Sequence, residues 1–500
     1  MAVEHVDVLI VGAGISGIGA AVHLKKECPS KSFAIFERRA DFGGTWSLFK
    51  YPGIRSDSDM YTLGFRFKPW TAEKAIADAP TILNYLSETV DEYKLKDKIR
   101  FDQHVKRASW STQTGLWTVE GTSAGKPMTV TCNMLFMCSG YYNYDGGFTP
   151  DFPGRDAYKG QFIHPQLWPE NLDYKGKSVV VIGSGATAVT LVPAMADRGA
   201  GHVTMLQRSP TYMVSRPSID AFARALQRWL PAKPAYAITR WRNVLMQLFF
   251  FNLARSRPQQ VKKKLLEAVT AELGPDYDIA THFTPRYNPW DERLCLVPDS
   301  DIFNAIKDGR ASVVTDHIES LTETGITLKS GKTLQADIIV SATGLNLQML
   351  AGMETFVDGQ RINFGDRILY KGIMFNDVPN LAMWFGYTNA SWTLKADLTS
   401  EYMCRVINHL DKTGQKIVTP VNDEPDMETG KFVDFSSGYF ARALDSLPRQ
   451  GTKLPWKLHQ NYAKDIRLLR HGTITDAVVF SNPHTVSEAV SAPALLEAAE

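Results

Sequence analysis

Residues 6–37 read VDVLIVGAGISGIGAAVHLKKECPSKSFAIFE and predict a strand, a glycine-rich turn, a helix and a second strand in immediate succession. The turn itself is the stretch Gly12-Ala13-Gly14-Ile15-Ser16-Gly17. In a turn of this kind the first glycine permits a tight bend, the second lets backbone approach a pyrophosphate, and the third allows close helix packing. The stretch therefore predicts a dinucleotide-binding unit in which Gly12, Gly14 and Gly17 contact the cofactor.

The second predicted strand ends at Glu37, which lies 20 residues after Gly17. An acidic side chain at this position accepts hydrogen bonds from the ribose hydroxyls of an adenosine. Because the carboxylate needs free hydroxyls, this unit suits a dinucleotide whose adenosine ribose is not phosphorylated.

Residues 178–209, SVVVIGSGATAVTLVPAMADRGAGHVTMLQRS, repeat the pattern with Ala188 in place of the third glycine. The position that would hold an acid is occupied by Arg208, 20 residues beyond Ala188. A guanidinium there can bind a ribose 2′-phosphate through two hydrogen bonds, and Ser209 adds a hydroxyl donor. The second unit is therefore predicted to prefer NADPH to NADH.

One chain thus carries an acid-type and an arginine-type unit, which together favour FAD as resident cofactor and NADPH as its reductant. We expect an α/β fold with two Rossmann-like dinucleotide-binding domains. The strand pattern 337–341 suggests that the chain there returns to the first domain. The FAD domain would comprise residues 1–145 and 335–500, and the NADPH domain residues 146–334 with a helical insertion at about 215–290.

Composition excludes several classes of protein. The 500 residues are 44% hydrophobic and 22% charged, which is typical of a globular chain with a sizeable core. Lys and Arg exceed Asp and Glu by only 55 to 53, so there is no overall basic field for nucleic acid. The 5 cysteines include no C-x-x-C pair, so neither a zinc site nor a redox dithiol is expected. We therefore expect no metal and no nucleic-acid partner, and we make no prediction of oligomeric state.

The N-terminal residues MAVEHVDV lack the basic start of an export signal, and the cysteine pattern fits a reducing compartment. The sequence therefore predicts a cytoplasmic protein. The apolar run 244–254 is too short to cross a bilayer. With Arg240, Trp241, Arg242, Arg255 and Arg257 around it, the segment 240–257 reads either as a buried helix or as one lying on a membrane surface.

Several further stretches resemble class B flavoprotein monooxygenases, and more closely the type I Baeyer-Villiger monooxygenases. Gly43-Gly44-Thr45-Trp46 is similar to the family's flavin-contacting G-G-T-W. Residues 158–169, YKGQFIHPQLWP, resemble its F-x-G-x-x-x-H-x-x-x-W-P fingerprint with Tyr158 in place of Phe. YPGIRSD at 51–57 and WDER at 290–293 match two more family motifs, and the resemblance covers nearly the whole chain.

The resemblance implies a flavin- and NADPH-dependent enzyme that inserts one oxygen atom of O2 into ketones through a flavin C4a-peroxide. The products would be esters or lactones, and sulfides or thioamides would be oxygenated in the same pocket. The partners would then be a small-molecule ketone or sulfide and O2. Two alternatives stay open: a monooxygenase that oxygenates only sulfur or nitrogen, and a flavoprotein that senses redox state without oxygenating anything.

The resemblance also implies roles for individual residues. Arg293 would stabilise the peroxide and the oxyanion, with Asp57 balancing its charge. Lys often precedes this arginine in close relatives, so Glu292 leaves more of the phosphate contact to Arg208 and Ser209. The FAD contacts would be Ser16, Glu37, Thr45, Trp46, Ser47, Leu48, Asp57 and Val105. The NADPH contacts would be Arg55, Ser56, Asp57, Gly183, Ser184, Gly185, Ala186, Thr187, Ala188, Val189, Thr190, Arg208 and Ser209.

Two other groups of residues complete the prediction. Gly160, His164 and Trp168 carry the fingerprint in a linker, where His164 would couple domain movement rather than touch substrate. Residues that could line a substrate pocket lie at 389–394 and 439–456.

Overall fold

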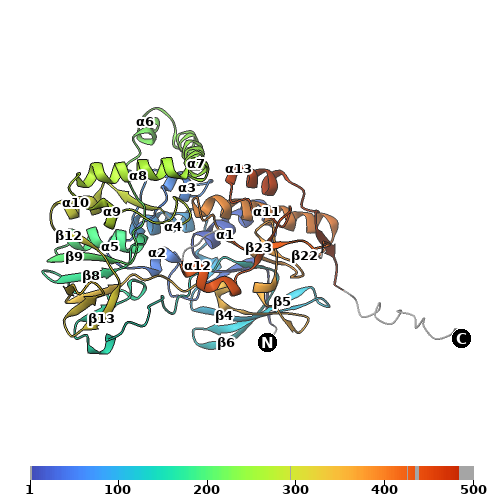
Figure 1. The fold of residues 1–500 in the computed structure, drawn as a ribbon. Coiled ribbons are helices and arrows are strands. Elements are labelled where there is room, and N and C mark those ends of the chain that lie inside the picture. Colours follow the sequence, from blue (N-terminus) through green and yellow to red (C-terminus); the bar gives the residue numbers. More distant parts are fainter. Residues whose placement is uncertain (1–2, 293, 425, 434–437, 484–500) are drawn as a thin grey trace, which may run out of the picture.

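The computed structural model describes residues 3–292, 294–424, 426–433 and 438–483. It contains two large sheets, and helices pack on each of them (Figure 1). Both candidate glycine turns lie at the carboxyl end of a central parallel strand. This arrangement confirms the predicted α/β fold with two dinucleotide-binding units.

The first sheet is mixed and runs in the order β18-β17-β4-β5-β6-β1-β2-β3, with β21 paired to β6. Strand β1 lies parallel to both β2 and β6, so the first turn faces the end of β6. The strands of this sheet are β1 (Glu4–Val11), β2 (Phe33–Phe36), β3 (Ile99–Arg100), β4 (Gln103–Ser111), β5 (Leu116–Ser123), β6 (Lys126–Met137), β17 (Glu354–Val357), β18 (Gln360–Arg361) and β21 (Leu381–Met383).

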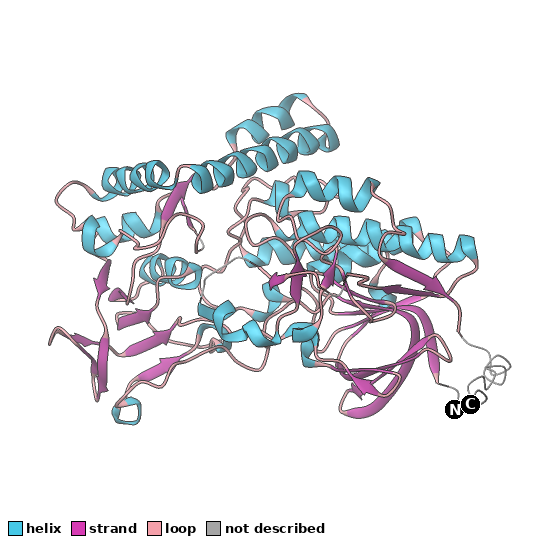
Figure 2. Ribbon diagram, turned by 45° about the vertical axis from the view of Figure 1, so that its right-hand side comes forward, coloured by secondary structure: helices cyan, strands magenta, loops and turns pink. Residues whose placement is uncertain are grey.

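Helix α1 (Ile15–Glu27) is buried on nearly every side from Ser16 to Leu24, because it lies between this sheet and α11 (Trp392–Thr413). Small residues make the close packing possible: a Cβ on Gly19 would lie 2.9 Å from the ring of Phe65. We call the part of the molecule built on this sheet the first half, and the part built on the second sheet the second half. Figure 2 shows the helices of the first half on one side and its strands on the other. The remaining helices here are α2 (Thr45–Leu48), α3 (Met60–Leu63), α4 (Ala79–Glu92), α12 (Gly438–Ala443) and α13 (Tyr462–Asp465).

The second sheet is parallel throughout, in the order β12-β9-β8-β16-β7, and α5 (Ala186–Asp197) follows β8. Its strands are β7 (Gln161–Ile163), β8 (Ser178–Ile182), β9 (His202–Gln207), β12 (Ala311–Thr315) and β16 (Ile338–Ser341). Beside it lie α10 (Asp301–Lys307) and a three-stranded sheet of β13 (Ile318–Thr322), β14 (Gly325–Leu328) and β15 (Thr333–Gln335).

The strand at 338–341 corrects one prediction. It was expected to open the second part of the FAD domain at residue 335, but it pairs with β8 and β7 in the middle of the second sheet. The chain rejoins the first sheet only at β17, which begins at Glu354. An apolar strand pattern fits the interior of either parallel sheet, so the pattern alone does not say which sheet it joins.

Between β10 (Met213–Arg216) and β11 (Cys295–Pro298), which pair with each other, the chain is helical. The helices are α6 (Ala221–Trp229), α7 (Ala232–Ser256), α8 (Pro258–Leu273) and α9 (Ile279–His282). Smaller two-stranded pairs complete the C-terminal part: β19 (Leu369–Tyr370) with β20 (Met374–Phe375), β22 (Ile417–Pro420) with β25 (Val478–Ser481), and β23 (Thr429–Lys431) with β24 (Arg449–Gly451).

Helix α7 is anchored on the first half of the molecule by Arg240. This guanidinium is buried and donates to the carbonyl oxygens of Tyr61 at 2.9 Å and Gly64 at 2.7 Å, and it lies 3.5 Å from the Asp397 carboxylate. The side chain of Arg240 therefore points into the protein and not toward solvent. No helix in the described part of the chain is long and apolar enough to cross a bilayer.

We expect Arg240→Ala to lower the free energy of unfolding by about 3 kcal/mol, because it leaves buried carbonyls without their donor and removes one of the two cationic partners of the Asp397 carboxylate. The thermal midpoint of the purified protein would fall by several degrees. Arg228→Ala is the matched control, since Arg228 is exposed on α6. Equal midpoints for the two variants would contradict the anchoring role.

Candidate flavin and NADP site

A cavity of about 330 Å³ lies where the ends of the two central strands approach each other. Thirteen of the residues expected to bind cofactor line it, from both halves of the chain. They are Gly12, Gly14, Ser16, Glu37, Thr45, Trp46, Arg55, Ser56, Asp57, Val105, Ala186, Thr187 and Thr190. The structure thus brings together, around one cavity, residues that are far apart in the chain and that the sequence assigns to cofactor binding.

The first turn is closed by contacts that only glycine allows. Gly12 has a φ of +106°, and a Cβ there would lie 2.6 Å from the carbonyl oxygen of Cys138 at the end of β6. A Cβ on Gly17 would lie 1.9 Å from the carbonyl oxygen of Gly12. These are the close approaches that the motif requires, and they leave the N-terminus of α1 facing the cavity.

Glu37 is almost fully buried at the cavity wall. Its carboxylate accepts hydrogen bonds from the backbone N–H of Ala13 at 2.9 Å and of Arg39 at 3.0 Å. Burial raises the pKa of Glu37, while these two donors and the Arg39 charge act in the opposite direction. The carboxylate is thereby fixed in orientation beside the first turn.

The second turn shares the geometry of the first. Gly183 has a φ of +136°, and a Cβ there would lie 2.4 Å from the carbonyl oxygen of Ala342 after β16. The hydroxyl of Ser184 donates to the backbone carbonyl of Ser209 at 2.9 Å, which joins the turn to the segment after β9. The N-terminus of α5 is therefore directed at the same cavity through Ala186 and Thr187.

The loop 51–57 packs against α5, the helix that follows the second turn. A Cβ on Gly53, where φ is +78°, would lie 2.6 Å from the Ala194 side chain and 3.1 Å from the Thr190 carbonyl, so the loop packs directly on α5. Arg55 pairs with Asp301 of α10 at 2.5 Å, and its Nη2 atom has no hydrogen-bond partner within the described residues although it is buried. An unpaired buried donor beside the cavity suits an anionic ligand.

The linker fingerprint lies outside the cavity wall. Gly160 packs against Tyr158, His164 contacts Gly344, and Trp168 packs against the core of the second half. Other predicted residues are likewise outside the lining set: Gly17, Ser47, Leu48, Gly183, Ser184, Gly185, Ala188, Val189, Arg208 and Ser209. Ala188 and Val189 are buried in the core instead, because their side of α5 faces the sheet.

Glu292 lies close enough to Arg208, the residue that the sequence assigns to the NADPH phosphate, for the two charges to interact. Burial raises the pKa of Glu292, and the charge of Arg208 counteracts this rise. Arg293, the predicted catalytic residue, lies outside the described residues.

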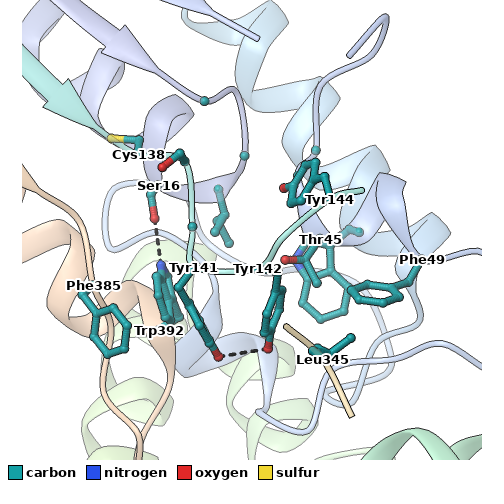
Figure 3. A pocket seen from close by; sticks show the side chains of 18 of the residues that line it. Ser16, Thr45, Phe49, Cys138, Tyr141, Tyr142, Tyr144, Leu345, Phe385 and Trp392 are labelled. Atoms are coloured by element: carbon teal, nitrogen blue, oxygen red, sulfur yellow. Dashed lines mark hydrogen bonds between the residues drawn. The ribbon is translucent and has the colours of Figure 1, made fainter. Parts of the chain in front are cut away.

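Aromatic side chains that the motifs did not identify form one wall of the cavity. Tyr141, Tyr142 and Tyr144 follow β6, and the first two join their hydroxyls at 2.9 Å (Figure 3). Trp392, at the start of α11, stacks on Tyr141 at 5.3 Å and donates its indole N–H to Ser16 Oγ at 2.7 Å. The predicted lining segments 389–394 and 439–456 contribute Ala390, Trp392, Tyr439 and Phe440.

Known proteins show the same two-unit design. Residues 75–436 match the model of the flavin-binding monooxygenase-like family, and residues 10–72 match an NAD(P)-binding Rossmann-like domain. This chain belongs to the flavin-binding monooxygenase-like family. That membership confirms the class of enzyme that the motifs predict.

Relatives match over nearly their full length. The chain is 54% identical over 473 residues to the FAD-containing monooxygenase EthA of Mycobacterium tuberculosis, covering 95% of this chain and 97% of that protein. It is 53% identical over 484 residues to a probable FAD-binding monooxygenase, AlmA, of Acinetobacter baylyi, covering 96% and 97%. The near-complete overlap confirms the close, chain-long resemblance expected from the motifs.

Solved structures share the fold at low identity. An oxidized steroid monooxygenase bound to NADP superposes with a TM-score of 0.75 at 21% identity, covering 96% of this chain and 100% of that one. The cyclohexanone monooxygenase of Rhodococcus sp. Phi1 bound to NADP+ gives 0.74 at 21%, with the same coverage. Both confirm the architecture of two dinucleotide-binding domains.

We expect Glu37→Gln to weaken flavin binding about tenfold, because the carboxylate loses one charged hydrogen-bonding oxygen beside the first turn. The apparent Kd for flavin on reconstituting the stripped protein measures this effect. Glu323→Gln, on the surface of the second half, is the control. An unchanged Kd together with an unchanged thermal midpoint would remove Glu37 from the flavin site.

Proposed function

We propose that the chain is an FAD-containing, NADPH-dependent monooxygenase of the Baeyer-Villiger type, which converts ketones to esters or lactones and also oxygenates sulfides or thioamides. The observation that carries the proposal is the single cavity reached by both dinucleotide turns, with Gly12 and Gly14 on one side and Ala186 and Thr187 on the other. A hydride donor and a flavin can meet only where two such sites share a cavity. The relatives named as FAD-containing monooxygenases support the same reading.

The first half fits FAD by the chemistry of its donors and acceptors. The N-terminus of α1 offers backbone N–H groups to a pyrophosphate, and buried Glu37 offers oxygens to ribose hydroxyls. When bound, FAD would accept hydride from NADPH and supply the activated oxygen that is transferred. The residues assigned to FAD are Gly12, Gly14, Ser16, Gly17, Glu37, Thr45, Trp46, Ser47, Leu48, Asp57 and Val105.

The second half is assigned to NADPH. Arg208 and Ser209 would hold the 2′-phosphate, and the buried free donor of Arg55 suits an anionic group of the same cofactor. Glu292 near Arg208 removes part of the positive charge there, which places more weight on the guanidinium itself. The other residues assigned to NADPH are Ser56, Asp57, Gly183, Ser184, Gly185, Ala186, Thr187, Ala188, Val189 and Thr190.

Arg293 is the proposed catalytic residue. Its permanently protonated guanidinium would stabilise the negative charge that develops on oxygen when a carbonyl carbon is attacked. Asp57 lines the cavity and would balance this charge. Tyr141, Tyr142 and Trp392 would keep water from that space, which strengthens every electrostatic contact inside it.

We also propose the domain organisation and the cellular place. The FAD domain would comprise residues 1–145 and the chain from β17 onwards, with the NADPH domain and its helical insertion between them. All five cysteines are buried thiols, which supports a reducing cytoplasm. The segment 240–257 is proposed to contact a membrane surface peripherally.

The decisive experiment gives the yellow holoenzyme NADPH, O2 and a panel of linear, cyclic and aryl ketones beside one sulfide, and identifies the products by mass. We expect esters or lactones from at least one ketone. Arg293→Ala would keep flavin reduction by NADPH but lose oxygenation by about a hundredfold or more, because the charge stabilisation is gone. Arg286→Ala, at an exposed arginine seven residues earlier in the chain, is the control.

Other outcomes point elsewhere. Sulfoxide without any ester would favour the monooxygenase that oxygenates only sulfur or nitrogen. Oxidation of NADPH that yields hydrogen peroxide with every substrate would favour a flavoprotein without oxygenation. Ester formation by Arg293→Ala at the normal rate would remove Arg293 from the mechanism.

We expect Arg208→Ala to raise the KM for NADPH about tenfold or more and to change the KM for NADH little, since only NADPH carries the 2′-phosphate. Steady-state rates with each cofactor provide the measurement. Arg198→Ala, at the end of α5, should leave both constants unchanged. A preference that Arg208→Ala leaves intact would show that another group reads the phosphate.

A further inference from the structure

Large apolar side chains are exposed in one place far more than elsewhere. Thirteen such residues are exposed in the described part of the chain, and nine of them lie between residues 219 and 250. They are Ile219, Phe222, Trp229, Ile238, Trp241, Leu245, Met246, Phe249 and Phe250, with Trp229 85% exposed. We call residues 219–257 the α6–α7 hairpin; its two helices project at the upper edge of the molecule in Figure 1.

The exposed residues follow the period of a helix. On α7 the positions 238, 241, 245 and 249 recur at intervals of three or four, which places them on one face. The opposite face carries Tyr236, Arg240 and Asn243, all buried against the first half of the molecule. Because Arg240 holds that face inward through the carbonyls of Tyr61 and Gly64, the apolar face stays outward.

The hairpin is also strongly basic. It contains seven Lys and Arg residues and one acid, a net charge of +6 in a chain whose total is +2, so the rest of the chain carries −4. The single acid, Asp220, already pairs with Arg242, whose guanidinium also lies 4.4 Å from the ring of Phe222. Arg228, Lys233 and Arg257 are exposed around the apolar face.

We propose that the α6–α7 hairpin is a docking surface for an anionic lipid bilayer. The apolar face would enter the boundary between headgroups and acyl chains, and the basic residues around it would contact lipid phosphates. Trp229 and Trp241 suit that depth, since indole rings favour the membrane interface. The proposal deepens the membrane contact stated above for residues 240–257, adds α6 to it, and names the lipid charge.

Charge distinguishes this occupant from a second copy of the chain. Arg240 and Arg255 pair with acids outside the hairpin, so the charge that its surface presents comes from residues such as Arg228, Lys233 and Arg257. Two hairpins packed face to face would bring these like charges together, which is unfavourable. An anionic bilayer instead offers opposite charge together with an apolar interior. The hairpin residues named here line no part of the cofactor cavity, so docking and oxygenation can be tested separately.

The test is flotation of the FAD-loaded full chain with vesicles of phosphatidylcholine, with and without about one third phosphatidylglycerol. We expect the protein to float with the anionic vesicles, to float less as salt is raised, and to stay below with the zwitterionic ones. Leu245→Ser with Phe249→Ser should lower the bound fraction about tenfold or more. Arg228→Glu with Lys233→Glu should do the same through charge alone.

Val479→Ser, at an exposed apolar residue outside the hairpin, is the matched control and should float like the parent protein. All variants should keep flavin content and oxygenation of a water-soluble substrate, so a failure of docking is separate from a failure of the proposed function. Absence of flotation with anionic vesicles overturns the proposal. A dimer in sedimentation that the two serine substitutions abolish would also overturn it, by assigning the face to a second copy.

Discussion

The contact of the loop 51–57 with helix α5 sets the geometry on which the proposed chemistry depends. Two dinucleotide turns on separate sheets share a cavity only if the parts that carry them are held at contact distance. Gly53 provides this contact, because its missing side chain lets the loop backbone lie against Thr190 and Ala194. The Tyr51 hydroxyl, hydrogen-bonded to Thr187, adds a polar contact at the same junction. Arg55 extends the junction to α10 through Asp301, so one short loop contacts two helices of the second half, α5 and α10.

A buried charge network ties the helical insertion to the first half of the molecule. Asp397 of α11 lies between Arg240 of α7 and His23 of α1, at 3.5 Å from each. Burial alone would lower the pKa of His23, but hydrogen bonds with Asp397 and Glu27 and the charges of both carboxylates raise it to about 9. His23 is therefore positively charged near neutral pH, and the buried carboxylate has cationic partners on two sides. Because the three residues come from distant parts of the chain, the network fixes how those parts pack.

Local patterns predicted local structure well. The two glycine turns, the strand before each and the position of Glu37 follow from short-range rules about backbone and ribose contacts. Interactions between distant segments did not follow from such rules. The strand at 338–341 is equally apolar in either sheet, and Arg240 resembles any arginine beside an apolar run. Tyr141 and Trp392 meet only because β6 ends and α11 begins at the cavity, which no spacing in the sequence records.

The fingerprint histidine gains a physical role from its two ring nitrogens. Nε2 lies 3.0 Å from the carbonyl oxygen of Gly344, so it carries the proton, and Nδ1 accepts the backbone N–H of Gln166 at 3.2 Å. Burial lowers the pKa of His164, which favours this neutral form. Gly344 also accepts a hydrogen bond from the backbone N–H of Phe148. The two segments through which the chain passes between the halves, one around Phe148 and one around Gly344, therefore run side by side at this point. His164 thus holds both connecting segments against the second half through the Gly344 carbonyl. A substitution there would act on how the two halves are held together and not on contact with substrate.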